Sequence, residues 1–214
     1  MNKAIIFDLD GTLIHSLEDI KDSINVTLAR YGHPLVDDCE AKKNIGNGAR
    51  RLVKDSIKEK LTDAEIDERL AFYNDVYTQS GSPKTRLFDG VNKLLSTLKS
   101  KGYKLAILTN KPQATTDEVY KKYLSHYEFD CVIGQSSAFE KKPAPDGAIE
   151  IMKRLGVLPE NTFFVGDGET DVLTAINSLT KGIAVLWGYR SKEQLIEAGA
   201  KIFVSTPEEL ADIL

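Results

Sequence analysis

The sequence has few of the features that mark secreted, membrane or nucleic-acid-binding proteins. Its 214 residues include two cysteines, Cys39 and Cys131, without CxxC spacing, which argues against a disulfide framework or a zinc site. No apolar run approaches the roughly 20 residues of a membrane helix, and the N-terminus has no signal-peptide core. The net charge is −4 without a block of Lys and Arg, so we expect no nucleic-acid partner and no membrane. A cytoplasmic protein follows as the expectation.

From about residue 85 onward, short apolar segments alternate with amphipathic ones. This rhythm predicts a parallel sheet that is covered by helices on both faces, in a Rossmann-like α/β fold. The segment Ala4-Ile5-Ile6-Phe7 predicts the first strand. Further strands are predicted at 104–108, 129–133, 162–165, 183–187 and 202–204, with helices that include 170–179, 191–198 and 207–213.

Residues 16–84 have a different pattern. Ile20, Ile24, Leu28 and Tyr31 recur at helical spacing, similar stripes follow, and no convincing strand interrupts them. We therefore predict two domains, which are a catalytic core formed by 1–15 plus 85–214 and an inserted all-helical cap formed by 16–84.

Four polar clusters stand at or after the carboxyl ends of predicted strands. Ligands of open parallel sheets bind at that edge. A pair of acids by itself is more often a turn or a helix cap, and only the four clusters together favour an active site. They are Asp8-Leu9-Asp10-Gly11-Thr12, Thr109-Asn110-Lys111, Lys141-Lys142-Pro143-Ala144-Pro145 and Gly166-Asp167-Gly168-Glu169-Thr170-Asp171.

These motifs, in this order, resemble those of the haloacid dehalogenase superfamily of hydrolases. Their order and the helical insert account for almost the whole chain. The insert resembles the all-helical cap of the subgroup that contains phosphoglycolate phosphatases. The resemblance implies a HAD-like core, a phosphatase activity and a small phosphate ester as the partner. The expected assembly is a monomer or a homodimer.

The resemblance implies a role for each residue of the first motif. Asp8 attacks phosphorus and forms an aspartyl-phosphate, which divides one difficult hydrolysis into two steps. Asp10 protonates the leaving alcohol and then deprotonates the water that cleaves the intermediate. Gly11 permits a close backbone approach, and Thr12 contacts the phosphate or the turn.

The implied cofactor is Mg²⁺, which prefers oxygen ligands. Asp8 and Asp167 each offer a carboxylate and Asp10 its backbone carbonyl, while Asp171 hydrogen-bonds a metal water or Lys142. The plain alternative for Asp167 is a helix N-cap after a strand, and both roles can hold together. Gly168 stands where many relatives have Ser, which removes a hydroxyl near the metal.

The remaining core motifs imply contacts to the transferring phosphoryl group. Thr109 offers its hydroxyl, and Asn110 its amide at the start of the following helix. Lys142 offsets negative charge on the phosphoryl oxygens and on Asp8. A surface lysine beside Lys141 is the alternative reading of Lys142.

The segment from Gly46 through Asn47 and Gly48 to Arg50 is the predicted substrate-reading loop of the cap. Exposed amides at a helix start, with Arg50 nearby, suit a carboxylate. A plain helix-starting turn with solvated arginines is an equal alternative, because glycine patterns are weak signals.

The substrate hypothesis is therefore 2-phosphoglycolate or a similar small acid phosphate. A phosphomutase resembling beta-phosphoglucomutase is the alternative, as are a pyrophosphatase, a sugar-phosphate phosphatase and a nucleotidase on the same scaffold. A binding protein that has lost catalysis predicts damage at Asp8, Asp10, Lys142 or Asp167, and all four are present.

Overall fold

Six parallel strands form the central sheet, in the order β5-β4-β1-β6-β7-β8. A computed structural model describes residues 3–214 of the chain. This sheet confirms the α/β fold that the alternating pattern predicts. The strands are β1 (Ala4–Phe7), β4 (Lys104–Pro112), β5 (Cys131–Gln135), β6 (Thr162–Gly166), β7 (Lys181–Val185) and β8 (Phe203–Val204).

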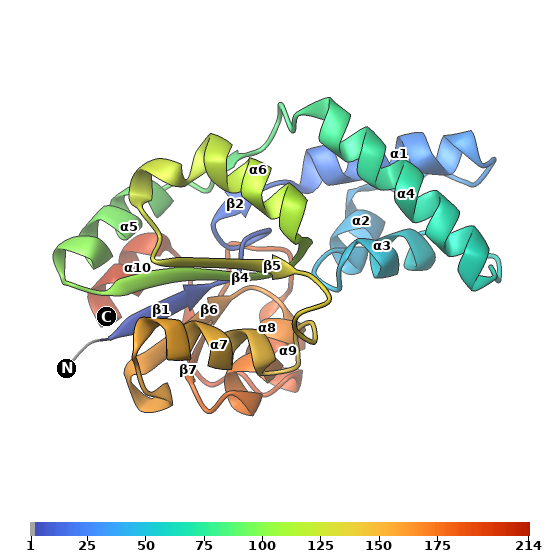
Figure 1. Cartoon of the computed structure of the whole chain (residues 1–214). Helices are drawn as coiled ribbons and strands as arrows, with labels where there is room; N and C mark the ends of the chain where they lie inside the picture. Colours follow the sequence, from blue (N-terminus) through green and yellow to red (C-terminus); the bar gives the residue numbers. More distant parts are fainter. Residues whose placement is uncertain (1–2) are drawn as a thin grey trace.

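Helices cover both faces of the sheet because the buried strands are apolar on both sides (Figure 1). Successive side chains of β1 point to opposite faces, so Ile5 and Phe7 pack in one apolar cluster and Ile6 in another. The first face is covered by α5 (Val91–Ser100), α6 (Gln113–Tyr123) and α10 (Pro207–Ile213), and the second by α7 (Asp146–Leu155) and α8 (Glu169–Asn177). The short α9 (Lys192–Glu197) packs through Leu195 against β7 and α8.

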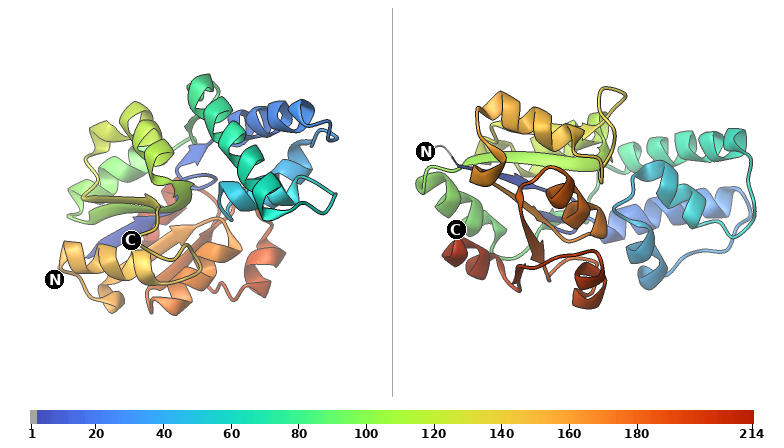
Figure 2. Two further views of the ribbon diagram at one scale, coloured as in Figure 1. Left: turned by 45° about the vertical axis from the view of Figure 1, so that its right-hand side comes forward. Right: turned by 90° about the horizontal axis from the view of Figure 1, so that it is seen from below.

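Four helices lie together beyond one end of the sheet (Figures 1 and 2). They are α1 (Leu17–Arg30), α2 (Asp38–Asn44), α3 (Ala49–Asp55) and α4 (Asp63–Ser80). Their buried side chains form an apolar cluster that includes Ile24, Leu28, Leu52 and Tyr73. We refer to these helices as the helical segment; the predicted domain limits of 16–84 stay a prediction.

A small antiparallel ribbon joins the helical segment to the sheet. β2 (Ile14–His15) pairs with β3 (Arg86–Leu87), and the sequence pattern predicted neither strand. The buried carboxylate of Asp19 accepts hydrogen bonds from the Lys84 amide and the Thr85 hydroxyl. The entry and exit of the helical segment are thereby tied together.

Two predicted strand positions need correction. β7 begins at Lys181, before the predicted 183, because its register pairs Lys181 with Phe163 and Gly182 with Phe164. The apolar Leu186 and Trp187 extended the prediction too far, since Trp187 lies past the strand and its indole donates to the Thr12 carbonyl. β5 likewise begins at Cys131 and not at 129.

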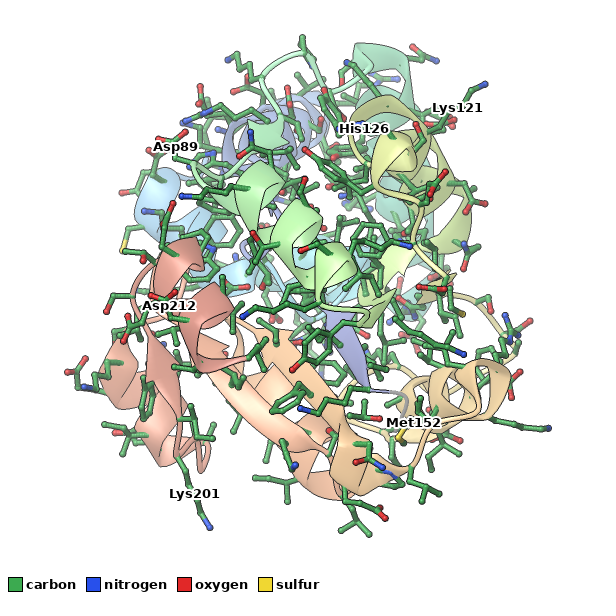
Figure 3. All side chains as sticks on the ribbon, turned by 90° about the vertical axis from the view of Figure 1, so that its left-hand side faces the viewer. Asp89, Lys121, His126, Met152, Lys201 and Asp212 are labelled. Carbon is green, nitrogen blue, oxygen red and sulfur yellow. The ribbon has the colours of Figure 1, made fainter. Side chains whose placement is uncertain are left out.

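The end of the molecule opposite the helical segment carries charged side chains on its surface. Figure 3 shows Lys201 and Asp212 projecting away from the ribbon at this end, where both are exposed. Within residues 3–214, no helix combines the length and the apolar character that a membrane span requires.

Candidate active site

The carboxyl ends of three neighbouring strands bring the acidic motifs together. In the sheet, Phe7 of β1 pairs with Ile107 of β4 on one side and Val165 of β6 on the other. The residues that follow these three in the chain therefore lie at the same carboxyl edge of the sheet. Asp8 leaves β1 there, and its amide donates to the Val165 carbonyl at 2.9 Å. Asp167 follows directly after β6.

A buried lysine bridges two of the acids. The ammonium of Lys142 donates to Asp8 Oδ1 and to Asp171 Oδ1, each at 2.6 Å, and all three side chains are buried. Asp171 also accepts from the Gly168 amide at 2.9 Å, at the start of α8. This position excludes the reading of Lys142 as a surface lysine.

Asp167 is held by contacts on both of its carboxylate oxygens. The Thr12 hydroxyl donates to Oδ1 at 3.0 Å, and the Tyr189 amide donates to Oδ2 at 2.8 Å. Gly11 has a φ of +92°, and a Cβ there would lie 2.4 Å from Asp167 Oδ2. At Gly188 a Cβ would lie 2.2 Å from the Cβ of Asp167. Only glycine fits at these two positions, so the backbone closes tightly around this carboxylate.

The arrangement concentrates negative charge in a buried place. Burial raises the pKa of Asp8 well above its ordinary value, and repulsion by Asp171 and Asp167 adds to this, while Lys142 opposes it. Burial, with repulsion by Asp171, raises the pKa of Asp167 to about 7. Burial alone would lower the pKa of Lys142, but attraction to Asp171 and Asp8 raises it instead.

Three of these carboxylates could hold a metal ion. One oxygen from each of Asp8, Asp167 and Asp171 lies within 4.8 Å of the others. A set of carboxylate oxygens suits a hard divalent cation such as Mg²⁺, which would also offset the repulsion that raises these pKa values. The side chain of Asp10 is not in this cluster. Its predicted metal contact is through the backbone carbonyl and stays a prediction.

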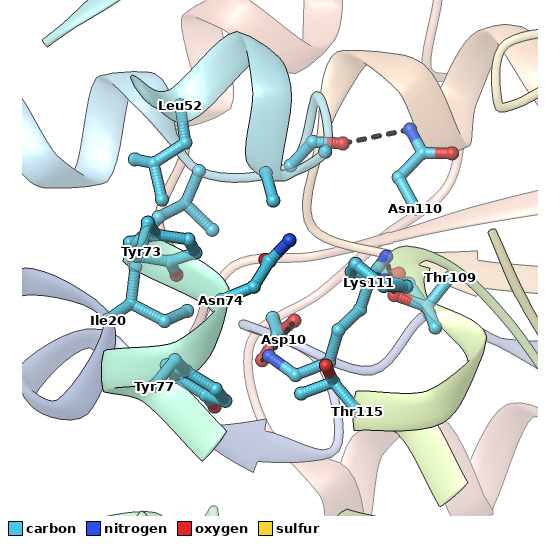
Figure 4. Close-up of a pocket in the computed structure, with 16 residues that line it drawn as sticks. Asp10, Ile20, Leu52, Tyr73, Asn74, Tyr77, Thr109, Asn110, Lys111 and Thr115 are labelled. Atoms are coloured by element: carbon cyan, nitrogen blue, oxygen red, sulfur yellow. Dashed lines mark hydrogen bonds and ion pairs between the residues drawn. The ribbon is translucent and has the colours of Figure 1, made fainter. Parts of the chain in front are cut away.

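The carboxylate of Asp10 lies on the other side, toward the helical segment. This carboxylate accepts a hydrogen bond of 2.6 Å from the Ser16 hydroxyl. It also forms an ion pair with Lys111, whose ammonium lies 3.1 and 3.2 Å from the two Asp10 oxygens. The Tyr189 hydroxyl accepts from the Ser16 amide at 3.0 Å and lies 3.5 Å from the Ser16 hydroxyl. Figure 4 shows Lys111 extending toward Asp10, with Tyr77 nearby.

A small pocket extends from the two aspartates of the first motif to the helical segment. Its cavity volume is about 50 Å³. The side chains that the helical segment contributes are mainly apolar or aromatic, whereas the strand ends contribute polar groups (Figure 4). The lining residues include Asp8, Asp10, Thr109, Asn110 and Lys111 from the sheet edge and Ile20, Ile45, Leu52, Tyr73, Asn74 and Tyr77 from the facing segment.

Thr109 and Asn110 both reach this edge, but Asn110 differs from its prediction. β4 continues to Pro112 and α6 begins at Gln113, so Asn110 lies in a strand and not at a helix start. Its side-chain amide donates to the carbonyls of Gly46 at 3.0 Å and Lys142 at 3.1 Å, and its Oδ1 accepts from the Lys142 amide at 2.9 Å. Asn110 thus joins three segments around the pocket, and these bonds occupy its side chain.

The predicted substrate-reading loop is only partly at the pocket. Gly46 and Gly48 line it, and Asn47 lines the neighbouring hollow beside Asp167. Arg50 does not reach either place, because its guanidinium is partly exposed and pairs with Asp63 at 2.8 Å and Asp67 at 3.0 Å. This position does not favour the predicted contact between Arg50 and a substrate carboxylate.

Sequence reasoning missed a buried arginine that fixes this loop against the core. Arg190 Nε donates to Glu169 at 2.8 Å, and its terminal nitrogens donate to the carbonyls of Lys42, Lys43 and Ile45, at 2.7 Å in the case of Ile45. These carbonyls end α2, where a positive group is favoured. The loop after β7 carries no local pattern that would have identified this contact.

Comparisons with known proteins agree with this geometry. A model of the haloacid dehalogenase-like hydrolase family matches residues 5–185. The chain belongs to this family. A phosphoglycolate phosphatase of Mannheimia succiniciproducens is 32% identical, over 99% of this chain and 96% of its own length. One from Aquifex aeolicus is 34% identical over 87% of this hydrolase and 86% of its own length.

Solved structures resemble this hydrolase over its whole length. A candidate phosphoglycolate phosphatase from Lactobacillus delbrueckii has a TM-score of 0.91 at 31% identity, covering 100% of this chain and 98% of its own. A haloacid dehalogenase-like protein from Streptococcus pneumoniae has a TM-score of 0.87 at 26% identity, covering 99% and 98%. The family predicted from the four motifs is thus confirmed.

Proposed function

We propose that this hydrolase is a magnesium-dependent phosphatase of small phosphate monoesters, with Asp8 as its nucleophile. The observation that carries the proposal is the buried contact of Lys142 with Asp8. Asp8 lies beside Asp167 and Asp171 and also lines the small pocket. A carboxylate paired with a buried ammonium at a cluster of acids suits phosphoryl transfer. The carboxylate can attack phosphorus, and the ammonium can offset the negative charge of the transferring phosphoryl group.

In the first step, an oxygen of Asp8 forms a bond to phosphorus while the bond to the leaving oxygen breaks. Asp10 enters this step carrying a proton and gives it to the leaving oxygen, so an aspartyl-phosphate, a neutral alcohol and an Asp10 carboxylate result. In the second step, water gives a proton to Asp10 and attacks phosphorus, which releases phosphate and restores Asp8. Asp10 lines the pocket and contacts Lys111, which lies over Tyr77 of the helical segment, so it is on the side from which the alcohol would leave.

Several groups would support the transferring phosphoryl group. The Lys142 ammonium sits on Asp8 Oδ1 and would stabilise charge that grows on the phosphoryl oxygens. The buried hydroxyl of Thr109 lies in the pocket beside Asp8, within reach of the same group. Asp8, Asp167 and Asp171 would hold Mg²⁺ directly or through water, and the ion would supply charge neutralisation and orientation of the phosphate.

Two observations support 2-phosphoglycolate as the substrate. Full-length relatives at about 30% identity are named phosphoglycolate phosphatase. The pocket that faces the proposed nucleophile has a volume of about 50 Å³, where roughly 10 to 15 Å³ holds a water molecule. Such a space suits a leaving group of a few heavy atoms better than a sugar or a nucleoside.

An activity panel tests this function. Purified protein with Mg²⁺ is assayed against 2-phosphoglycolate, pyrophosphate, sugar phosphates and nucleoside monophosphates, and kcat/KM is compared. We expect phosphoglycolate to be preferred and activity to vanish with EDTA and return with Mg²⁺. A flat profile would overturn the substrate assignment, and absence of phosphate release from every ester would overturn the proposed function.

A further inference from the structure

Lys111 is the basic residue that lines the small pocket, among the side chains that the structure describes there. It stands two residues beyond Thr109 in β4, and its side chain is 6% exposed. Its ammonium lies 4.5 Å from the centre of the ring of Tyr77, which belongs to α4. The positive charge is therefore held between the proposed catalytic acids and the helical segment.

The buried ammonium of Lys111 has one anionic partner among residues 3–214, the carboxylate of Asp10. The proposed function requires that carboxylate at the leaving oxygen of the substrate. A buried cation is strongly destabilised without a counter-charge. A negatively charged group of the substrate, placed near the leaving oxygen, would take the place of Asp10 beside Lys111.

The surroundings of Lys111 fit such a group. The hydroxyl of Tyr77 is buried and has no hydrogen-bond partner within the described residues, so it is available to an incoming acceptor. Both Tyr77 and Lys111 line the same pocket. A carboxylate there could accept from the ammonium and the phenol together, which is the usual arrangement for a desolvated anion.

Other nearby cations are already engaged. Lys142 is held by Asp8 and Asp171, and Arg190 by Glu169 and three carbonyls. Arg50 faces away from the pocket and pairs with acids of α4. Lys111 is the cation placed to meet the leaving part of a substrate.

We propose that Lys111 binds a second negatively charged group of the substrate. This contact restricts the preferred substrates to phosphate monoesters with a carboxylate close to the ester oxygen. This inference rests on the proposed function and deepens it. The carboxylate accepts hydrogen bonds from Lys111 and Tyr77 while the phosphate sits at Asp8 and Lys142.

A matched pair of substrates isolates this charge. 2-Phosphoglycolate and its amide, 2-phosphoglycolamide, have nearly the same size and leaving group, but only the first has a carboxylate. Any change that affects catalysis in general cancels in the ratio of their kcat/KM values. The wild-type protein should prefer the carboxylate by about 100-fold, because the amide leaves Lys111 without an anion. A ratio below about fivefold would overturn the proposal without any variant.

The Lys111→Met variant keeps the length of the side chain and removes its charge. We expect its ratio to fall to within about threefold of one, mainly through a higher KM for phosphoglycolate. Lys99→Met is the matched control, because Lys99 also faces an aspartate, Asp130 at 3.8 Å, at the opposite edge of the sheet. It should keep the wild-type ratio. A ratio above about tenfold in Lys111→Met would overturn the role of Lys111.

Failure of this inference and failure of the proposed function give different results. If the wild type hydrolyses both esters equally well, the phosphatase stands and the reading of charge by Lys111 is wrong. If it hydrolyses neither ester nor any other phosphate monoester with Mg²⁺, the proposed function itself is wrong.

Discussion

The two sides of the pocket differ in chemistry and in how they are built. The sheet edge carries buried charges, with Asp8 after β1 and Lys142 from the segment between β5 and α7 in direct contact. The helical segment carries mainly apolar side chains toward the same space, such as Leu52 and Tyr73. In the proposed function the sheet edge would provide the reacting groups, and we expect the helical segment to limit which leaving groups fit and to exclude water from them.

The two sides also differ in what holds them in place. Groups of the sheet edge are fixed by strand register and by the close glycine contacts around Asp167. The loop of the helical segment depends on contacts made from the core, chiefly Asn110 with Gly46 and Arg190 with the end of α2. Changes at the sheet edge should therefore abolish the reaction, whereas changes in the helical segment should alter it by smaller amounts.

The largest effect is expected at the proposed nucleophile. Asp8→Asn keeps the shape of the side chain but removes its charge, so kcat should fall by roughly 10⁴-fold or more for every phosphate ester. The control is Asp212→Asn, at an exposed aspartate far from the site, which should leave kcat unchanged. Steady-state kinetics with several esters measures both. Appreciable turnover by Asp8→Asn would mean that another group attacks phosphorus.

Arg190→Ala should produce an intermediate effect, because it leaves the carbonyls at the end of α2 without their buried donor. We expect kcat/KM to fall by about 10- to 100-fold for carboxylated and uncarboxylated esters alike. Amide hydrogen exchange at residues 42–46 should quicken at the same time. Unchanged exchange there would show that the loop does not depend on this contact.

Arg50→Ala should change kcat/KM by less than about twofold for any ester, since its guanidinium is partly exposed and directed at Asp63 and Asp67. The comparison of phosphoglycolate with p-nitrophenyl phosphate provides the check. A selective rise in KM for phosphoglycolate would restore the original prediction that this arginine reads the carboxylate.

The smallest effect concerns helix caps on the two sides. The Thr62 hydroxyl accepts from the Glu65 amide at the start of α4, and the Thr206 hydroxyl accepts from the Glu209 amide at the start of α10. Thr62→Ala and Thr206→Ala should each lower stability by about 1 kcal/mol, a shift of roughly 2 to 4 °C in Tm, without changing kcat/KM. Thermal melts measure this. A loss of activity in Thr62→Ala alone would show that fraying of α4 reaches the pocket.

The sheet and its motifs could be predicted from the sequence because both depend on local patterns. Alternation of apolar segments indicates parallel strands, and residues that follow such strands must meet at one edge. This reasoning brought Asp8, Asp167 and Lys142 together correctly. The short ribbon of β2 and β3 escaped it, because two residues in each strand are too few to form a pattern.

The helical side of the pocket could not be predicted in the same way. Arg50 was selected because it follows a glycine-rich turn, yet its direction depends on α4, whose acids attract it. Lys111 lies near the carboxyl end of β4, in the motif Thr109-Asn110-Lys111, and was passed over, since a lysine after two polar residues has no distinctive spacing. Its significance emerges only from its burial and its contact with Asp10.

The most direct test of the central claim is to trap the intermediate on Asp8. Enzyme in excess of phosphoglycolate, with Mg²⁺, is quenched in acid during the first turnover, and its peptides are analysed by mass spectrometry. A phosphoryl group on the peptide that contains Asp8, absent from the Asp8→Asn variant, is the predicted result. Release of phosphate with no phosphorylated peptide at any quench time would contradict the account.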